Sequence, residues 1–299
     1  MMAFHTSMFT PFTPISSIDI SSGASALRPD TLGIHDIQVL QQIYGANLTT
    51  RAGADTYGFG TTAGPVYDFD LNLDPMLTIW DAGGIDTLDL SRYSAAQTVS
   101  LIAGSQSSIG GFLGNLSIAF GTVIEHAFGG RGADAITGNA AANLLRGNRG
   151  RDTLSGDQGH DTLEGGAGSD TLYGGAGNDV ATYASATGAV AVSLSTGLGS
   201  GNHATGDVLF EIEHLIGSNF ADTLTGDSGA NSLFGGLGND SLYGGDGGDT
   251  LIGGSGSDRL FGGDGFDIAD YSGSTAAVSV NLATGLGSGG DAAGDTLTG

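Results

Sequence analysis

Aspartate and glycine recur at a fixed spacing along much of this chain, and that spacing could support metal chemistry. Residues 129–182 and 217–270 read as nonapeptides of the form G-G-x-G-x-D-x-U-x, where U is a large apolar residue. Each of these two arrays holds six units. The sixth position is aspartate in ten of the twelve, and Asn143 and Asn231 fill the other two. Carboxylate and carbonyl oxygens in flexible geometry suit Ca²⁺ better than Zn²⁺ or Mg²⁺.

The period of the pattern predicts the fold. Two nonapeptides, 18 residues, can form one coil of two turns and two short strands, and coils stack about 4.8 Å apart. The apolar residues at position eight then point inward as the core. Aspartates 18 residues apart become neighbours, as with Asp134 and Asp152, and stacked carboxylates repel unless a cation lies between them. A solvated Gly/Asp linker is the alternative, but it would not need leucine at every ninth residue. We therefore expect an all-β parallel β-roll that is stabilised by calcium.

The candidate ligands within the arrays are the position-six side chains and the glycines at positions two and four, whose carbonyls can turn toward a cation. They are Gly130, Gly132, Asp134, Asn143, Gly150, Asp152, Gly159, Asp161, Gly166, Gly168, Asp170, Gly175, Gly177, Asp179, Asp222, Asn231, Gly236, Gly238, Asp240, Gly245, Gly247, Asp249, Gly254, Gly256, Asp258, Gly263, Gly265 and Asp267.

A longer period of 88 residues contains both arrays. The spacer that begins at Tyr183 returns at Tyr271, and Ile124-Glu125-His126 returns as Ile212-Glu213-His214. The third such unit stops at Gly299, before its Ile-Glu-His element, so we expect the native chain to continue beyond this residue.

Composition narrows the possible partners. The formal charge is −24, with eight arginines and no lysine, which argues against nucleic acid and anionic membranes as partners. The absence of cysteine excludes disulfides and thiolate metal sites. The sequence contains no apolar stretch of about 18 residues, so no transmembrane segment is predicted. Residues 1–14 lack the features of a secretory signal peptide.

The region before the arrays predicts one helix and several short strands. Apolar spacing from Leu32 to Tyr44 indicates a helix, with Asp30 or Thr31 as its N-cap and Gly45 at its end. Strands are expected at 56–59, 77–80, 87–90, 98–102 and 117–124.

Residues 32–152 resemble the C-terminal domain of serralysin-type secreted zinc metalloproteases, the peptidase M10 family. The stretches that carry the resemblance are DIQVLQQIYGANLTTRAGADTYGF (36–59), WDAGGIDTLDLSRYS (80–94) and GNLSIAFGTVIEHAFGGRGADAITGN (114–139). The nonapeptides are similar to the calcium-binding repeats of RTX proteins. The resemblance implies calcium ligands before the roll at Arg51, Gly53, Asp81, Gly83, Gly84, Asp86 and Glu125, although Val123 replaces the threonine of that family's Thr-x-Glu segment. Ordinary Asp/Gly turn chemistry is the alternative for Asp81 and Asp86.

The same family's catalytic motif, His-Glu-x-x-His-x-x-Gly-x-x-His, is not found in this chain. None of the six histidines are spaced i, i+4, which a helix needs to place two imidazoles on one zinc. We therefore expect no enzyme activity and no zinc in this chain. The expected function is that of a secreted, calcium-binding RTX module that leaves the cell by type I export, folds on Ca²⁺, and holds a catalytic domain encoded upstream. The alternatives are a structural or adhesive surface protein and a carrier module of another secreted enzyme.

The expected organisation follows from these boundaries. It comprises a linker and helix at the junction with a catalytic domain (1–45), a β-rich cap (46–128), a first array (129–182), a spacer (183–216), a second array (217–270) and a second, truncated spacer (271–299).

Overall fold

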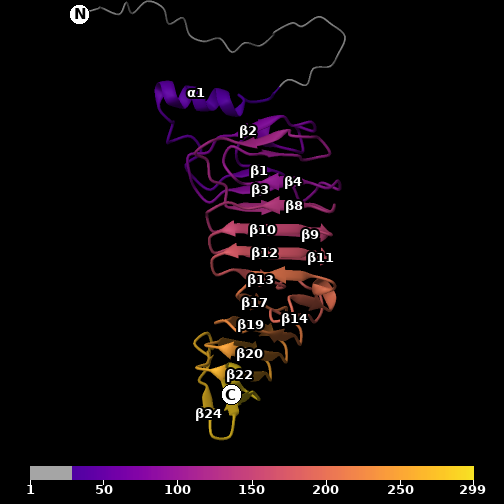
Figure 1. The fold of residues 1–299 in the computed structure, drawn as a ribbon, viewed down its shortest axis with the longest axis vertical. Coiled ribbons are helices and arrows are strands. Elements are labelled where there is room, and N and C mark those ends of the chain that lie inside the picture. The colour runs from indigo at the N-terminus through magenta and orange to yellow at the C-terminus, as the bar shows by residue number, and fades with distance from the viewer. Residues whose placement is uncertain (1–28) are drawn as a thin grey trace, which may run out of the picture.

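The structure, a computed structural model, describes residues 29–299 and shows a column of stacked β-coils beneath one short helix (Figure 1). Its strands form two long sheets that face each other and a small sheet near the N-terminal end. The ten-stranded sheet contains, in order, β1 (Thr56–Gly58), β3 (Thr87–Asp89), β7 (His126–Phe128), β9 (Leu144–Gly150), β11 (Thr162–Gly168), β13 (Val180–Thr182), β17 (His214–Ile216), β19 (Ser232–Leu237), β21 (Thr250–Ser255) and β23 (Ile268–Ala269).

The thirteen-stranded sheet forms the opposite face. Its strands are, in order from the N-terminal end, β4 (Thr98–Ser100), β8 (Ala135–Thr137), β10 (Thr153–Gln158), β12 (Thr171–Ala176), β16 (Val208–Phe210), β15 (Leu198–Ser200), β14 (Ala191–Ser193), β18 (Thr223–Thr225), β20 (Ser241–Gly247), β22 (Arg259–Gly265), β26 (Thr296–Thr298), β25 (Leu286–Ser288) and β24 (Ser279–Asn281). The small sheet contains β2 (Leu77–Ile79), β6 (Leu116–Ile118) and β5 (Gln106–Ser107). Three short 3₁₀ helices are η1 (Pro65–Tyr67), η2 (Asn202–Ala204) and η3 (Gly290–Ala292).

The 18-residue coil expected from the period is confirmed. Successive nonapeptides contribute strands to alternate sheets, and within each array a strand pairs in parallel with the strand 18 residues further on. In the thirteen-stranded sheet Leu154 is in register with Leu172, and in the ten-stranded sheet Leu145 is in register with Leu163. The chain therefore forms the predicted parallel β-roll, which is all-β apart from its short helices.

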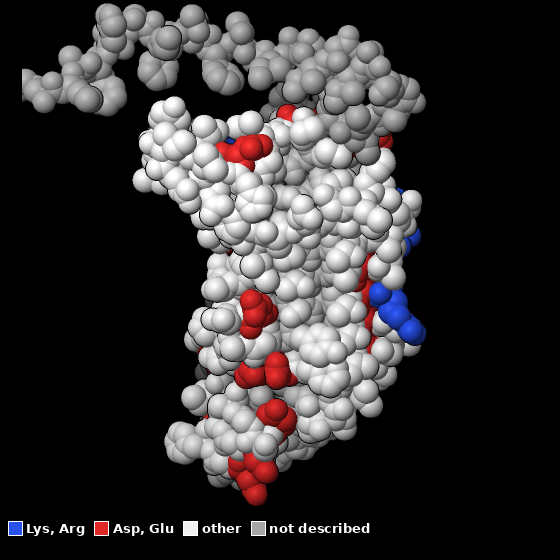
Figure 2. Space-filling view, turned by 45° about the horizontal axis from the view of Figure 1, so that its top comes forward, with Lys and Arg blue, Asp and Glu red and all other residues white. Residues whose placement is uncertain are grey.

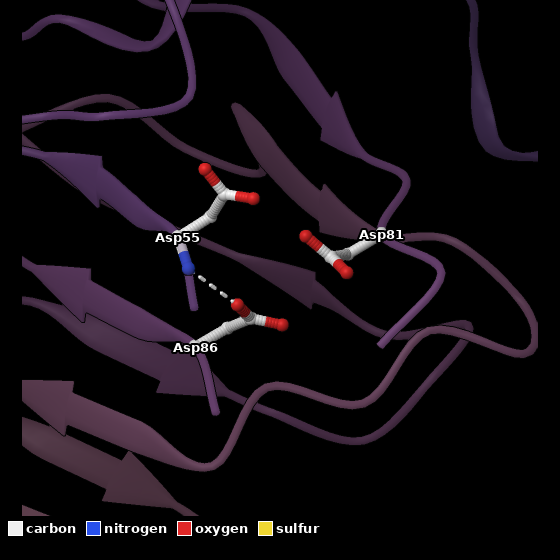
Figure 3. Close-up of side chains that lie close together, drawn as sticks. All are labelled: Asp55, Asp81 and Asp86. Atoms are coloured by element: carbon white, nitrogen blue, oxygen red, sulfur yellow. Dashed lines mark hydrogen bonds between the residues drawn. The ribbon is translucent and has the colours of Figure 1, made fainter. Parts of the chain in front are cut away.

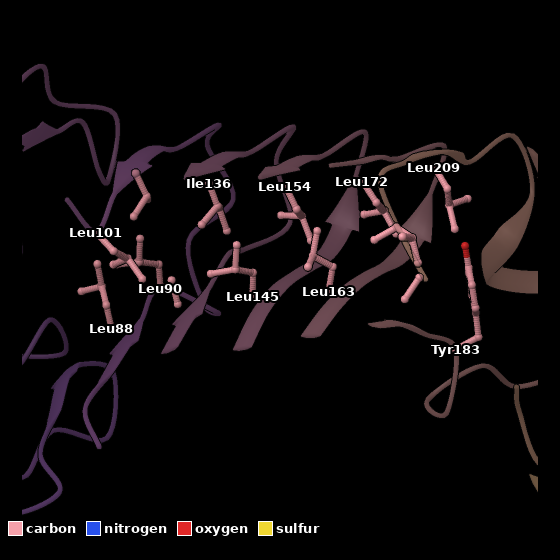
Figure 4. Close-up of a cluster of buried hydrophobic side chains, with 14 of the residues drawn as sticks. Leu88, Leu90, Leu101, Ile136, Leu145, Leu154, Leu163, Leu172, Tyr183 and Leu209 are labelled. Carbon is pink, nitrogen blue, oxygen red and sulfur yellow. The ribbon is translucent and has the colours of Figure 1, made fainter. Parts of the chain in front are cut away.

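The core is a double row of apolar side chains along the axis of the roll. Ile136, Leu154 and Leu172 come from one sheet and face Leu145 and Leu163 from the other (Figure 4). These five side chains are essentially fully buried. The second array repeats the arrangement with Leu224, Leu233, Leu242, Leu251 and Leu260. Within the arrays each strand supplies one core side chain, so the core there is narrow and adds little apolar area per residue.

Helix α1 (Ile34–Tyr44) begins two residues later than predicted and its predicted N-cap is wrong, whereas its predicted end at Gly45 is confirmed. Gly33 is the N-cap, and its N–H donates to Asp36 Oδ2 at 3.2 Å. Asp30 and Thr31 instead accept hydrogen bonds from the backbone N–H groups of Met76 (2.9 Å) and Thr78 (2.6 Å), which fixes this segment to the small sheet. The polar side chains that were expected to cap the helix are therefore used in tertiary contacts.

The cap before the arrays extends both long sheets. Strands β1, β3 and β7 continue the ten-stranded sheet, and β4 continues the thirteen-stranded sheet. The strand expected at 117–124 is wrong beyond Ile118, because a turn closes there: the Thr122 N–H donates to the Ala119 carbonyl, and Gly121 has φ 83°.

The spacer between the arrays affects the two sheets differently. It adds one strand, β17, to the ten-stranded sheet, but three strands, β16, β15 and β14, to the other. Strand β15 runs antiparallel to both of its neighbours, so β14 and β15 form a hairpin. The second spacer repeats the antiparallel arrangement with β26, β25 and β24. The coils below β17 lie to one side of those above it (Figure 1).

Position four of the nonapeptide shows how closely the coils approach. A Cβ added to Gly168 would overlap the carbonyl oxygen of Gly150 in the preceding coil. The predicted effect of Gly168→Ala is a loss of about 1–3 kcal/mol in the free energy of unfolding at saturating calcium, because the coils would have to separate. The matched control is Gly273→Ala, where a Cβ would meet nothing within 4 Å. Urea unfolding would compare the two, and equal stabilities would contradict this account.

Candidate metal sites

The position-six side chains form two columns, one at each edge of the roll. In each column, the carboxylate Oδ1 accepts a hydrogen bond from the backbone N–H of the position-six residue in the preceding coil. The Asp152 N–H donates to Asp170 Oδ1 at 2.8 Å, and the Asp161 N–H donates to Asp179 Oδ1 at 2.8 Å. The second array repeats the contact, for example from Asp240 to Asp258 at 2.9 Å. Aspartates that the sequence placed 18 residues apart are therefore neighbours in space.

The second oxygen of most of these carboxylates has no partner. Seven Oδ2 atoms in the arrays are buried and accept no hydrogen bond from the described residues. They belong to Asp152, Asp161, Asp170, Asp179, Asp240, Asp249 and Asp258. A buried carboxylate oxygen without a partner is costly, and a bound cation removes that cost. This is the donor set that a hard cation requires, so the residues present fit calcium.

The space around each free oxygen is bounded by backbone. Asp152 Oδ2 lies beside Gly147, the first residue of its own nonapeptide, where an added Cβ would overlap the oxygen. The same Cβ would lie 2.6 Å from the carbonyl oxygen of Gly165, the first residue of the nonapeptide in the next coil. Carboxylate and carbonyl oxygens thus approach the same small volume, which stays open only because position one is glycine. The position-one carbonyls were not among the ligands predicted from sequence.

The backbone conformation at position two decides whether the position-six side chain is closed or open. We call it closed where the position-two N–H donates a hydrogen bond to it, and open where no such bond forms. In the first two nonapeptides of each array, the position-two N–H donates to the position-six side chain. Examples are Gly130 to Asp134 Oδ2 (2.6 Å) and Asn139 to Asn143 Oδ1 (2.7 Å). Ser218 and Asp227 make the same bond to Asp222 and Asn231.

In the other eight nonapeptides, position two has a positive φ and makes no such bond among the described residues. These residues are Asn148 (70°), Asp157 (82°), Gly166 (91°), Gly175 (106°), Gly236 (106°), Gly245 (114°), Gly254 (92°) and Gly263 (108°). The left-handed conformation, which glycine and asparagine adopt most readily, turns the amide away and leaves the carboxylate open. All eight open positions hold aspartate, and both asparagines occupy closed positions. The structure thus divides the predicted ligands into two groups.

Burial changes the acidity of the open carboxylates. Desolvation, together with repulsion from neighbouring aspartates, raises the pKa of Asp152 to about 7 and that of Asp240 to about 7. The same causes raise the pKa of Asp161 to about 6 and that of Asp258 to about 6. Hydrogen bonds from the backbone act in the opposite direction but do not outweigh burial. Without a cation, these groups therefore take up protons at a higher pH than an exposed aspartate does.

A third carboxylate cluster lies in the cap. One carboxylate oxygen from each of Asp55, Asp81 and Asp86 lies within 4.8 Å of the others (Figure 3). Asp86 Oδ1 accepts the Asp55 N–H at 2.7 Å, and its buried Oδ2 has no partner among the described residues. Desolvation raises the pKa of Asp86 to about 7. Gly84 (φ 144°) packs directly on the Gly53 carbonyl, so the two predicted glycine segments meet beside this cluster.

The other predicted cap residues have different surroundings. The Glu125 Oε2 accepts the Asp86 N–H at 2.7 Å, which makes Glu125 the next member of the same column. Arg51 lies over the ring of Tyr67, 4.7 Å from its centroid, and its Nη1 donates to the Trp80 carbonyl. The predicted ligand segment at Arg51 is therefore held in place by its side chain.

Four column members were missed in the sequence. Asp55 begins one column, Asp207 and Glu213 continue the columns through the spacer, and Asp295 follows Asp258. The Asp170 N–H donates to Asp207 Oδ1 at 2.8 Å, and the Asp179 N–H donates to Glu213 Oε2 at 2.8 Å. A signal for these four residues was present in the sequence. Each is an acidic residue that comes two positions before an apolar residue, as at the end of a nonapeptide, but the full set of glycines that precedes it in a nonapeptide is missing.

Comparison with known proteins agrees with this geometry. The model of the family described as peptidase M10 serralysin C terminal matches residues 46–196, half of the chain. The chain belongs to this family. The RTX calcium-binding nonapeptide repeat matches residues 216–251 and 238–269. The chain is therefore a serralysin-type C-terminal module with calcium-binding repeats.

The relatives share only this part. Serralysin G of Dickeya chrysanthemi is 49% identical over 107 residues, which is 35% of this chain and 22% of the relative. Metallopeptidase AprA of Pseudomonas marginalis is 47% identical over 110 residues, 36% of this chain and 23% of the relative. Serralysin of Proteus mirabilis is 46% identical over 110 residues, 36% of this chain and 22% of the relative. The chain thus spans between a fifth and a quarter of the relatives that it matches.

An open carboxylate within a column should respond differently to substitution from an exposed aspartate outside the columns. We expect Asp170→Asn to raise the calcium concentration at the folding midpoint severalfold, because it removes one charged oxygen from an open position. Asp157→Asn is the matched control, since Asp157 is exposed outside the columns and the equivalent position of the preceding nonapeptide already holds an asparagine, Asn148, with the same left-handed backbone. Circular dichroism during a calcium titration measures both midpoints. Equal shifts in the two variants would refute the distinction.

Acidification should have opposite effects with and without calcium. Because burial raises the pKa of Asp152 and Asp240 to about 7, the metal-free folded state binds protons that the unfolded chain, with aspartate pKa near ~3.9, does not bind. The stability of the metal-free roll should therefore increase as the pH falls from about 7 toward 4. With calcium present, protons compete with the metal, so the calcium midpoint should rise over the same range.

Circular dichroism of calcium-stripped protein and of protein titrated with calcium, each at pH 8 and pH 5, measures both effects. An unchanged calcium midpoint, or loss of metal-free β-structure on acidification to pH 5, would contradict the proposed role of these carboxylates.

Proposed function

We propose that this module folds when Ca²⁺ binds between its coils after export from the cell, and that it supports a partner domain without itself catalysing a reaction. The observation that carries the proposal is the row of buried, unpartnered aspartate oxygens along both edges of the roll. Each requires a cation or a proton, and calcium is the cation that the RTX repeats of this chain indicate.

The proposed ligands are the open aspartates of neighbouring coils together with the backbone carbonyls at positions one, two and four. Open positions continue without a gap from Asp152 to Asp179 and from Asp240 to Asp267. In the cap, the proposed ligands are Asp81 and Asp86, with Asp55, Gly53, Gly83, Gly84 and Glu125 completing or bordering the site. No lysine is present to compete for these carboxylates.

Magnitudes support the coupling of folding to calcium. Ordering the backbone costs about 1–2 kcal/mol per residue, and the narrow leucine core offsets only part of this cost. Calcium modules outside cells bind with dissociation constants of about 10⁻⁴–10⁻³ M. At about 1 mM calcium each site then adds roughly 0.4–1.4 kcal/mol, and the contributions of stacked sites add together. At the much lower calcium of a cytosol this contribution nearly vanishes, which would keep the chain unfolded for type I export.

Helix α1 supports the proposed role of holding a partner. None of its residues is buried, and its apolar side chains Val39, Ile43 and Tyr44 are 50%, 64% and 73% exposed. The partner proposed for this helix is a catalytic domain encoded upstream, as the serralysin relatives suggest. None of the described helices is long and apolar enough to cross a membrane. A structural or adhesive surface protein remains the second candidate, because the 88-residue unit recurs with its spacer.

The first test of this function is calcium-dependent folding. We expect the chain to show little β-structure in excess EGTA and a cooperative gain of β-structure with millimolar calcium, since the carboxylates repel one another until cations bind. Circular dichroism with calcium, and with magnesium at the same concentration as control, measures this. A complete β-sheet spectrum in EGTA at pH 8 would refute the coupling.

The second test concerns catalysis. The 299-residue chain alone should not cleave casein, with or without added zinc, because no pair of its histidines has the spacing of the zinc helix. The assay compares the calcium-loaded chain with an active metalloprotease at equal concentration. Cleavage that phenanthroline inhibits would show that the proposal is wrong.

A further inference from the structure

Each 88-residue unit carries a groove at the same place, between the ten-stranded sheet and the 3₁₀ helix of the spacer. The first groove is bordered by β9, β11 and η2 and has a volume of about 540 Å³. The second is bordered by β19, β21 and η3 and has a volume of about 390 Å³. Residues 88 apart occupy equivalent positions, so the same backbone feature occurs twice with different side chains.

The first groove is basic, although the protein is strongly acidic. Arg131, Arg146 and Arg149 line it together with His203, and its one acidic lining residue is Glu164. These are three of the eight arginines in a chain with a formal charge of −24 and no lysine. The positive side chains in Figure 2 gather mainly along one edge of the roll. The equivalent positions in the second groove hold Asn219, Phe234, Leu237 and Asp291.

One of the three arginines is compensated and fixed. Arg146 Nε lies 2.8 Å from Glu164 Oε2, the cross-strand neighbour of Arg146. The guanidinium also lies over the ring of Phe128, 5.0 Å from its centroid. Arg146 therefore forms a rigid positively charged wall with its own counter-charge, and the remaining charge of the groove comes from the other two arginines.

Arg131 and Arg149 are not compensated. They occupy position three of nonapeptides 18 residues apart, so they lie one coil spacing from each other, about 4.8 Å along the axis. Neither forms an ion pair with any residue that the structure describes. Their backbones are fixed, because the Arg131 N–H donates to the Tyr93 carbonyl (2.8 Å) and the Arg149 N–H to the Gly130 carbonyl (3.2 Å). Because their backbones are fixed one coil apart, both guanidinium groups can reach a single anion, which would also offset the repulsion between them.

His203 provides an independent indication of a ligand. It is the middle residue of η2 and lines the groove, and its Nδ1 is buried without a hydrogen-bond partner among residues 29–299. A buried polar nitrogen of this kind normally has a partner. An oxyanion in the groove would provide the missing acceptor if this nitrogen carries the proton.

We propose that the first groove is an oxyanion-binding site, in which Arg131 and Arg149 hold a sulfate, phosphate or carboxylate group and His203 contributes a further donor. Guanidinium groups bind such oxyanions with two parallel hydrogen bonds, which makes paired arginines selective for them. The second groove lacks all three donors and binds no anion. The groove wall includes Gly130 and Gly166, which are candidate calcium ligands, but its arginine side chains belong to neither acidic column.

The test uses the calcium-loaded full chain and two probes, sodium sulfate and sodium acetate, each exchanged for sodium chloride at constant ionic strength. Sulfate represents tetrahedral oxyanions and avoids the precipitation of calcium phosphate, and acetate represents carboxylates. NMR chemical shifts of backbone amides report where each probe binds. We expect saturable shifts at Arg149 and His203 with at least one probe, and none at the equivalent Leu237 and Asp291.

The variant Arg131→Gln/Arg149→Gln should weaken binding by about tenfold or more, because it removes two charge-assisted donors. The control Arg92→Gln/Arg259→Gln removes the same charge elsewhere and should leave the affinity within about twofold. If the first variant does not reach the wild-type circular dichroism spectrum in calcium, Arg149→Gln alone replaces it. The proposal is overturned if neither probe binds, if both grooves respond equally, or if both double variants bind with the same affinity.

Discussion

The distance between coils determines which side chains this protein can tolerate at each repeated position. Any residue that recurs every 18 positions lies about 4.8 Å from its own copy in the next coil. For leucine this stacking is favourable, and it produces the double row in the core. For aspartate it is unfavourable, because each carboxylate is buried beside others of the same charge. The leucine rows and the acidic columns thus arise from one geometric constraint, and the proposed role of the cation is to make the acidic columns compatible with a folded chain.

Within that constraint, a single backbone angle decides whether a carboxylate is available to a metal. Where position two has negative φ, its amide occupies the carboxylate, as with Gly130 and Asp134. Where position two is left-handed, as at Asp157 and Asn148, the oxygen stays free. In the closed pair of nonapeptides at the start of each array, the position-six side chains are therefore satisfied by hydrogen bonds from the chain itself. In both arrays the closed pair lies where the array joins the cap or the spacer, whose strands continue the same two sheets.

The sequence predicted the repeated parts of this fold well and the irregular parts less well. The period of 18 and the inward leucines depend on spacing alone, and spacing is visible without coordinates. The division between open and closed nonapeptides was not visible in the same way, because Gly130 and Gly166 are the same residue type at the same position but differ in φ. Asp207 and Glu213 were missed because the spacer keeps the register of the columns while abandoning the glycines. The predicted N-cap of α1 was wrong because Asp30 and Thr31 bind a distant segment, and no local rule predicts that choice.

The unequal contribution of the spacer to the two sheets affects the shape of the molecule. One face gains three strands and the other gains one, so the contour lengths of the two faces differ by two strand spacings, about 9–10 Å. A stack with one longer face cannot keep a straight axis, and it turns toward the shorter face. The spacer recurs after 88 residues with the same antiparallel insertion. Each recurrence therefore bends the axis of the roll toward the same sheet. A chain with many such units would therefore trace an arc or a superhelix, with the ten-stranded face on the inner side of the curve.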